Sequence, residues 1–334
     1  MVPRLFLSLA ALALVALIVI GLWPMPSYRS AYRVLGCLDR EVLYEAKLEQ
    51  ARADPPYDLM TFGNSRVIDV GDGELGLPGL RFFGMGIGGT SFRQSVVTLE
   101  ALAEAGRAPR VAVLSFDNVA LLYAQLPYDF PLPPARWRQR AGDLAALVDA
   151  PYAVGPDWRK FFRNLAVTEM AALARTINLF RLEERLFAWA GIVPDGRACH
   201  VWDADGSHRR PPVERDLDGA APKPWPVYED RYPLLEHDLD RLARIQAAGT
   251  RVIVYESPLY PAVADALDPA LPPEMAGQRR RLIEGCRTRG LECHPAPRLV
   301  GNAEDGFWPD ATHAPPHALG RFIAGLVRPH LATP

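Results

Sequence analysis

The stretch RVAVLSF, residues 110–116, decides the fold expected for this chain. It is a continuous apolar run, which is typical of a strand buried on both faces of a parallel sheet. A second such run, RVIVYESP, occupies residues 251–258. Shorter apolar runs at residues 57–63, 80–91 and 291–297 are interrupted or closed by glycine or proline and predict three more strands.

Helical spacing of apolar residues fills the intervals between these strands. It predicts helices within residues 91–106, 232–250, 272–290 and 315–331. Strands that alternate with helices predict a single three-layer α/β/α domain of the flavodoxin-like, doubly wound type, with a parallel sheet of about five strands. In such sheets, functional sites gather at the carboxyl ends of the strands.

The segments outside this pattern give the expected domain organisation. A short tail, residues 1–4, precedes an uncharged apolar segment at 5–23 that is long enough to span a bilayer. We interpret this segment as an uncleaved signal anchor, with a cleaved signal peptide as the alternative, because no small-residue cleavage site follows it. Residues 24–56 are expected to form a helical stalk, and 57–334 the α/β domain.

Residues 120–228 interrupt the alternation with proline-rich and polar sequence. We interpret them as an insertion in the α/β domain. Two interpretations remain open for it: a lid or substrate wall, since long insertions in compact domains are often functional, and a peripheral decoration.

Composition excludes several functional classes. The 334 residues are 49% hydrophobic and 23% charged, as in ordinary globular proteins, and the formal net charge of -2 gives no basic surplus for nucleic acid. There is no Walker A motif and no zinc-type pair of Cys-x-x-Cys motifs, so no cofactor and no metal is expected.

Four cysteines are compatible with an exported protein. Cys286 and Cys293 are near neighbours and could pair, and Cys37 and Cys199 could form a second bridge. Four cysteines allow three connectivities, so the sequence leaves the pairing open.

The first candidate functional residue is Ser65, in Gly63-Asn64-Ser65 at the end of the first expected strand. It is either a turn residue or a nucleophile. A second Gly-x-Ser ends at Ser91, which is better explained as the N-cap of the following helix. Arg66, beside Ser65, is either an anion contact or a solvated charge.

Asp310 and His313 form the second candidate element, just before the last helix. An aspartate three residues before a histidine can reach its ring nitrogen, fix the tautomer and stabilise the imidazolium. Asp205 and His208 have the same spacing, but they lie in the insertion, and we expect His208 to be a solvated loop residue. A metal site with His317 is disfavoured by the prolines between the two histidines.

The order of these blocks resembles the SGNH (GDSL-like) hydrolase superfamily. Gly63-Asn64-Ser65 matches the first block, GMGIGGTS at 84–91 the second, LSFDN at 114–118 the third, and Asp310 with His313 the last. The resemblance covers roughly residues 57–120 and 229–330. It implies a catalytic triad of Ser65, His313 and Asp310.

The resemblance also implies an oxyanion hole, formed by the amide of Ser65, by Gly86 or Gly88, and by Asn118. The third block of the family usually reads Gly-x-Asn-Asp, whereas here the asparagine stands one place later, after Asp117. Either Asn118 shifts into the oxyanion hole, or backbone amides act without it.

The pairing of FGNSRV with GMGIGGTS looks most like membrane-anchored SGNH proteins of cell-envelope acyl transfer, such as teichoic acid D-alanyl transfer and alginate acetylation proteins. This branch implies an O-acetyl esterase or O-acyltransferase. Its domain would lie outside the cytoplasm on a single-pass inner-membrane anchor, act on a polysaccharide or other acylated envelope substrate, and have a membrane acyltransferase as partner. The alternative from another class is a non-catalytic scaffold or polysaccharide-binding accessory protein.

Overall fold

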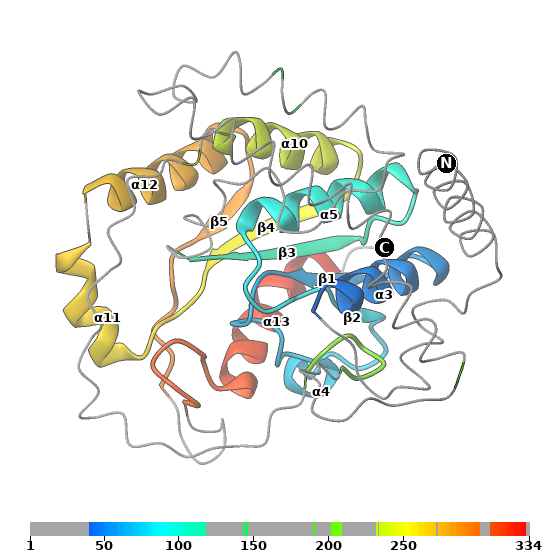
Figure 1. The fold of residues 1–334 in the computed structure, drawn as a ribbon, viewed down its shortest axis with the longest axis horizontal. Coiled ribbons are helices and arrows are strands. Elements are labelled where there is room, and N and C mark those ends of the chain that lie inside the picture. Colours follow the sequence, from blue (N-terminus) through cyan, green and yellow to red (C-terminus); the bar gives the residue numbers. More distant parts are fainter. Residues whose placement is uncertain are drawn as a thin grey trace, which may run out of the picture.

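Five parallel strands form one sheet at the centre of the fold (Figure 1). They are β1 (Leu59–Phe62), β2 (Phe82–Gly84), β3 (Val111–Phe116), β4 (Arg251–Glu256) and β5 (Glu292–His294). Their order across the sheet is β2-β1-β3-β4-β5, the order of flavodoxin-like doubly wound folds. In the register of the sheet, Leu59 of β1 lies opposite Phe82 of β2 and Val111 of β3. The expected α/β class and parallel sheet are therefore confirmed.

The computed structural model describes residues 40–117, 143, 145, 190, 202–208, 232, 234–271, 273–300 and 308–331. The expected membrane anchor at 5–23 and most of the expected insertion at 120–228 lie outside these residues. Within the described part of the chain, no helix combines the length and the apolar character needed to cross a bilayer.

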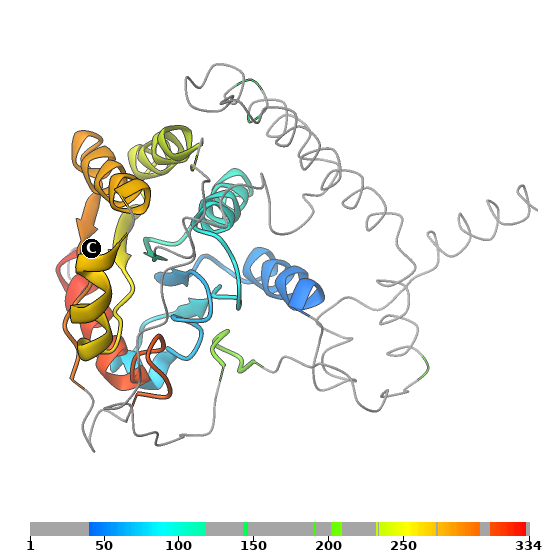
Figure 2. The same ribbon diagram turned by 60° about the vertical axis from the view of Figure 1, so that its left-hand side comes forward.

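Helices cover both faces of the sheet (Figures 1 and 2). Among the described residues the helices are α3 (Arg40–Ala53), α4 (Asp72–Leu75), α5 (Phe92–Glu104), α10 (Leu235–Ala247), α11 (Pro261–Leu267), α12 (Pro273–Thr288) and α13 (Pro316–Leu331), with a 3-10 turn η3 (Asp268–Ala270). Helices α3, α5, α10 and α12 share one buried apolar cluster with the sheet, and α4 and α13 share another. Successive strand residues point to opposite faces, so Met60 belongs to the first cluster and Leu59 to the second.

Helix α3 corrects the expected domain boundary. Residues 24–56 were expected to form a stalk, but Tyr44, Leu48 and Ala51 of α3 are buried in the core beside α5. The sequence pattern concealed this because α3 also carries charged residues, among them the buried Lys47. The described part of the domain therefore begins at Arg40 rather than at residue 57.

Two local expectations about bonds are confirmed. Ser91 caps α5, since its hydroxyl accepts a hydrogen bond of 3.1 Å from the amide of Gln94. Cys286 at the end of α12 forms a disulfide with Cys293 of β5. Cys37 and Cys199 lie outside the described residues.

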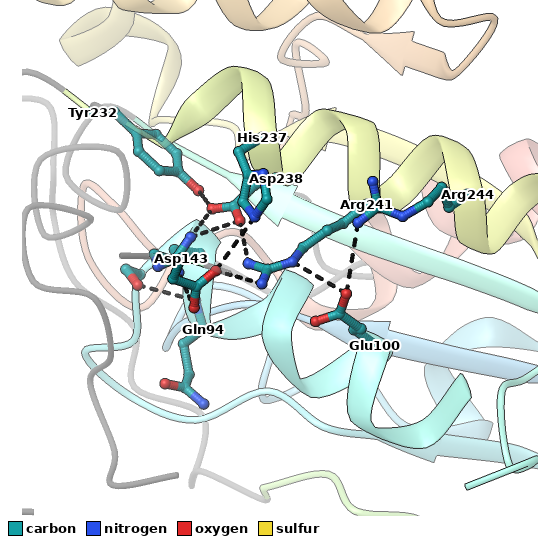
Figure 3. Close-up of polar contacts among 10 residues, drawn as sticks. Gln94, Glu100, Asp143, Tyr232, His237, Asp238, Arg241 and Arg244 are labelled. Carbon is teal, nitrogen blue, oxygen red and sulfur yellow. Dashed lines mark hydrogen bonds and ion pairs between the residues drawn. The ribbon is translucent and has the colours of Figure 1, made fainter. Parts of the chain in front are cut away.

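A buried cluster of charged side chains joins α5, α10 and Asp143 (Figure 3). The guanidinium of Arg93, with no exposed surface, lies 2.8 Å from Asp143 and 2.6 Å from Asp238. Arg241 contacts both carboxylates and donates to Glu100 at 3.1 Å. Because buried charges are tolerated only when paired, this cluster fixes α5 against α10.

Candidate active site

The turn after β1 presents Ser65 at the carboxyl edge of the sheet. Its first residue, Gly63, has φ +154°, a backbone conformation that side chains disfavour. A Cβ atom there would lie 1.9 Å from the hydroxyl of Ser115 in β3. Only glycine allows the chain to leave β1 this close to β3, and the path brings Ser65 to a half-buried position.

Ser65, His313 and Asp310 form a hydrogen-bonded chain across this edge. His313 Nδ1 lies 2.7 Å from Asp310 Oδ2, and His313 Nε2 lies 2.9 Å from Ser65 Oγ. A carboxylate can only accept, so Nδ1 carries the proton and Nε2 is the acceptor for the serine hydroxyl. The distance expected between the serine and histidine atoms of a working pair, about 2.6–3.2 Å, is met.

Hydrogen bonds from neighbouring groups keep the carboxylate of Asp310 ionised and fix its position beside His313. Its Oδ1 accepts from the amide of Thr312 at 2.7 Å, the hydroxyl of Thr312 at 2.8 Å and the amide of His313 at 3.0 Å. Partial burial alone would raise the pKa of Asp310, but the hydrogen bonds from His313 and Thr312 outweigh it and bring the pKa well below its usual range. The carboxylate is thus ionised at neutral and mildly acidic pH.

Asp117, at the end of β3, anchors the turn that carries Ser65. Its Oδ2 accepts from the side-chain amide of Asn64 at 2.7 Å and lies 3.4 Å from Nε of Arg66. Asn64 in turn accepts from the amide of Arg66 at 3.0 Å. Arg66 is therefore an ion-pair partner with a side chain only 10% exposed, rather than a solvated charge.

The third block of the predicted site is only partly described. Asn118, the candidate oxyanion donor, lies outside the described residues. Its neighbour Asp117 is buried and engaged with Asn64 and Arg66. Sequence reasoning assigned Asp117 no role. Its position after a buried strand, at the edge where Ser65 stands, was the signal that could have identified it.

The glycine turn, residues 84–90, lies along the turn that carries Ser65. The amide of Ile87 donates to the carbonyl of Gly63 at 3.0 Å, and the hydroxyl of Thr90 donates to the same carbonyl at 3.0 Å. A Cβ atom on Gly88 would lie 3.8 Å from Cβ of Ser65. Gly88 is thus a direct neighbour of the serine.

Gly86, the other oxyanion candidate, has different neighbours. A Cβ atom there would lie 3.0–3.1 Å from the side chains of Ile68 and Val67, and its carbonyl accepts from Lys47 Nζ at 2.8 Å. Of the two glycines, Gly88 is therefore the better candidate for a group that contacts a reacting ester.

Lys47 of α3 is a second residue that sequence reasoning missed. Its side chain is fully buried, and Nζ donates to the carbonyls of Gly84 at 3.0 Å, Gly86 at 2.8 Å and Gly206 at 2.6 Å. The ammonium form has three N–H donors for these three carbonyls, whereas the neutral amine has only two. A lysine within an otherwise amphipathic helix gives no sequence signal for such a position.

The protonation of Lys47 predicts how stability changes with pH. Burial lowers the pKa of Lys47 to about 7, and the nearby carboxylate of Asp205 opposes this shift. An unfolded lysine titrates near pH 10.4, so between about pH 7 and 10 the unfolded chain binds more protons than the folded chain. The contribution of Lys47 to the free energy of unfolding should therefore rise with pH across this window.

Urea unfolding of wild type and Lys47→Met at pH 7 and pH 9.5 measures this contribution. Because other titrating groups are common to both proteins, the difference between wild type and variant isolates the lysine. We expect the wild type to gain stability relative to Lys47→Met at the higher pH. A constant or shrinking difference would show that the folded lysine keeps its proton.

The alternative aspartate–histidine pair forms no comparable arrangement. The carboxylate of Asp205 accepts from the amide and hydroxyl of Ser207 and from the amide of Asp72. His208 is half buried and donates its amide to the carbonyl of Ile68, so it is not the solvated loop residue that was expected. His317 is exposed on α13.

Comparison with models of protein families, with curated proteins and with solved structures found no match for the chain. The site is therefore interpreted from its own geometry.

Proposed function

We propose that the protein carries out serine-dependent acyl-ester chemistry, as an O-acetyl esterase or O-acyltransferase, with Ser65 as nucleophile. The observation that carries this proposal is the chain from Asp310 through His313 to Ser65, with contacts of 2.7 and 2.9 Å. A serine hydroxyl is a poor nucleophile unless a base takes its proton during attack. In this proposal His313 is that base, and Asp310 holds the tautomer that the base needs.

The proposed reaction proceeds in two halves. Ser65 Oγ attacks the ester carbonyl while its proton moves to His313 Nε2, and the carbonyl oxygen becomes an oxyanion. The backbone amides of Ser65 and the glycine turn beside it, with Asn118 as the remaining donor, would stabilise that charge. The tetrahedral intermediate then expels the alcohol, which takes the proton from His313, and leaves an acyl group on Ser65.

The second half decides between the two activities. In an esterase, water attacks the acyl-serine, and in an acyltransferase a sugar hydroxyl does so. His313 removes the proton of either acceptor, so the same residues serve both reactions.

We further propose a cell-envelope or exopolysaccharide substrate and a domain outside the cytoplasm, on the inner membrane. The apolar segment at 5–23 supports a single-pass anchor. The disulfide between Cys286 and Cys293 supports an oxidising compartment, since such bonds are rare in the cytosol. A membrane acyltransferase that supplies or receives the acyl group is the proposed partner.

A fluorophosphonate probe tests the activated serine directly. We expect the full-length, detergent-solubilised protein to be labelled at Ser65, because the reagent phosphonylates only a serine with a working base. Labelling should disappear in Ser65→Ala and persist in Ser91→Ala, the other serine of a Gly-x-Ser sequence. Absence of labelling in the folded wild type would contradict the proposal and leave a non-catalytic scaffold as the better interpretation.

A further inference from the structure

Lys47 lies behind the glycine turn, on the side away from the strand that leads to Ser65. Two of its three hydrogen bonds go to carbonyls of this turn, those of Gly84 and Gly86. The amides that follow these carbonyls point the other way, because C=O and N–H are antiparallel in a trans peptide. Met85 donates to the carbonyl of Thr61 at 2.8 Å, and Ile87 to the carbonyl of Gly63 at 3.0 Å.

Two peptide units of the glycine turn therefore connect Lys47 to β1 and Gly63, the residues that lead to Ser65. Each has its carbonyl on the ammonium group and its N–H on β1 or the residue after it. A hydrogen bond accepted by the carbonyl polarises the peptide and strengthens the hydrogen bond that its N–H donates, since linked hydrogen bonds reinforce one another. Lys47 thus fixes the planes of the peptides that lead into Gly88.

The third hydrogen bond of Lys47 ties a distant segment to the same place. Gly206, in the segment 202–208, accepts from Nζ at 2.6 Å. Its backbone lies so close to Gly84 that a Cβ atom on Gly206 would be 2.4 Å from the carbonyl oxygen of Gly84. The amide of Gly84 donates to the carbonyl of Asp205 at 2.7 Å. The glycine turn is thus held between β1 and the segment 202–208, with Lys47 as the common donor.

We propose that Lys47 is a positioning residue for catalysis, which holds the glycine turn, and Gly88 with it, beside Ser65 in the geometry where the oxyanion forms. This inference rests on the proposed function of Ser65. Loss of the lysine would leave three buried carbonyls without their donor, a state costly enough to make the backbone move. A displacement of about 1 Å in catalytic groups can cost a hundredfold in rate.

The test compares Lys47→Met with Gln50→Met in the full-length protein. Gln50 is the matched control, because it lies one turn further along α3, is also buried, and donates to the carbonyl of Ala204 at 3.0 Å. It contacts the segment 202–208 but makes no such bond to the glycine turn. With p-nitrophenyl acetate as substrate, we expect Lys47→Met to lower kcat about ten- to a hundredfold with KM nearly unchanged, since oxyanion donors act in the transition state.

Gln50→Met should keep kcat within about twofold of wild type. A second readout is the downfield proton resonance of the hydrogen-bonded Nδ1–H of His313, which should persist in Lys47→Met because the triad itself is not disturbed. If Lys47→Met fails to fold by circular dichroism, Lys47→Gln, which keeps two N–H donors, takes its place, with a smaller loss of kcat expected.

Three results would overturn the inference. The first is an unchanged kcat in the folded lysine variant, and the second is an equal loss in Gln50→Met. The third is loss of the His313 resonance in the lysine variant, which would assign Lys47 to the folding of the whole site. If instead the wild type neither cleaves p-nitrophenyl acetate nor is labelled at Ser65, the proposed function fails, and the inference fails with it.

Discussion

Replacing Ser65 or His313 by alanine is expected to lower kcat for p-nitrophenyl acetate by about 10⁴-fold or more while the far-ultraviolet circular dichroism stays unchanged. In the proposed mechanism the serine supplies the attacking oxygen, and the histidine, whose Nε2 lies 2.9 Å from that oxygen, removes its proton. Neither group works without the other, so the double variant Ser65→Ala/His313→Ala should be hardly worse than either single variant, as is found for residues that act as a unit.

Asp310→Ala should cost less than either of these changes. In the proposed mechanism the aspartate acts only by holding the histidine and takes no part in bond formation. Removing the aspartate of such a triad lowers kcat less than removing the serine or the histidine. His317→Ala is the matched control, since His317 lies on the first turn of α13 and is exposed. Steady-state kinetics of all the variants provide the measurement. Multiplicative losses in the double variant, or full activity in Ser65→Ala, would contradict a serine–histidine mechanism.

The second large effect is expected on stability, at Arg93. The buried cluster has two guanidinium groups and three carboxylates, which are Arg93, Arg241, Asp143, Asp238 and Glu100. Arg93→Met would leave Asp143 and Asp238, whose side chains are almost fully buried, with Arg241 as their remaining guanidinium partner. Removing one partner of a buried ion pair typically costs about 3–5 kcal/mol, and we expect a loss of free energy of unfolding in this range.

Arg287→Met provides the control for Arg93→Met. Arg287 pairs with Glu284 on the surface of α12, with side chains 74% and 58% exposed. Surface pairs contribute little to stability, so this variant should unfold almost as the wild type does. Urea titrations followed by circular dichroism give both values. Equal effects of the two changes would mean that Arg93 is not paired as the structure has it.

The sequence predicted the sheet because its strands lie in short apolar runs, which buried parallel strands require, and glycine or proline interrupts or closes the shorter runs. It predicted Ser65, His313 and Asp310 as a group because their positions after the first strand and before the last helix point to one edge of the sheet. The contact at 2.9 Å confirms this geometrical prediction, while the chemistry assigned to it stays a prediction.

The sequence reasoning missed both Lys47 and Asp117, although the place of Asp117 after a buried strand was a usable signal, and Lys47 gave none. Each is a charged residue whose partners are distant in sequence, and for Lys47 the partners are backbone carbonyls, which no residue pattern marks. The prediction of the domain boundary was wrong for the same reason, because a helix with a lysine on its buried side does not show the pattern of a core helix. Whether a polar side chain is buried depends on partners that are distant in the sequence. The burial of apolar side chains can be predicted from their periodicity along the sequence.

Ser65 and His313 are 248 positions apart in the chain, and this separation has a consequence for biogenesis. A growing polypeptide exposes its N-terminal half first, so Ser65 is made long before its proposed base, His313. Until the C-terminal loop and α13 have been synthesised and have packed against the sheet, the hydroxyl of Ser65 is as inert as that of any serine in water. A prematurely terminated chain would carry the nucleophile without the means to use it, so that reactivity would appear only in the finished molecule.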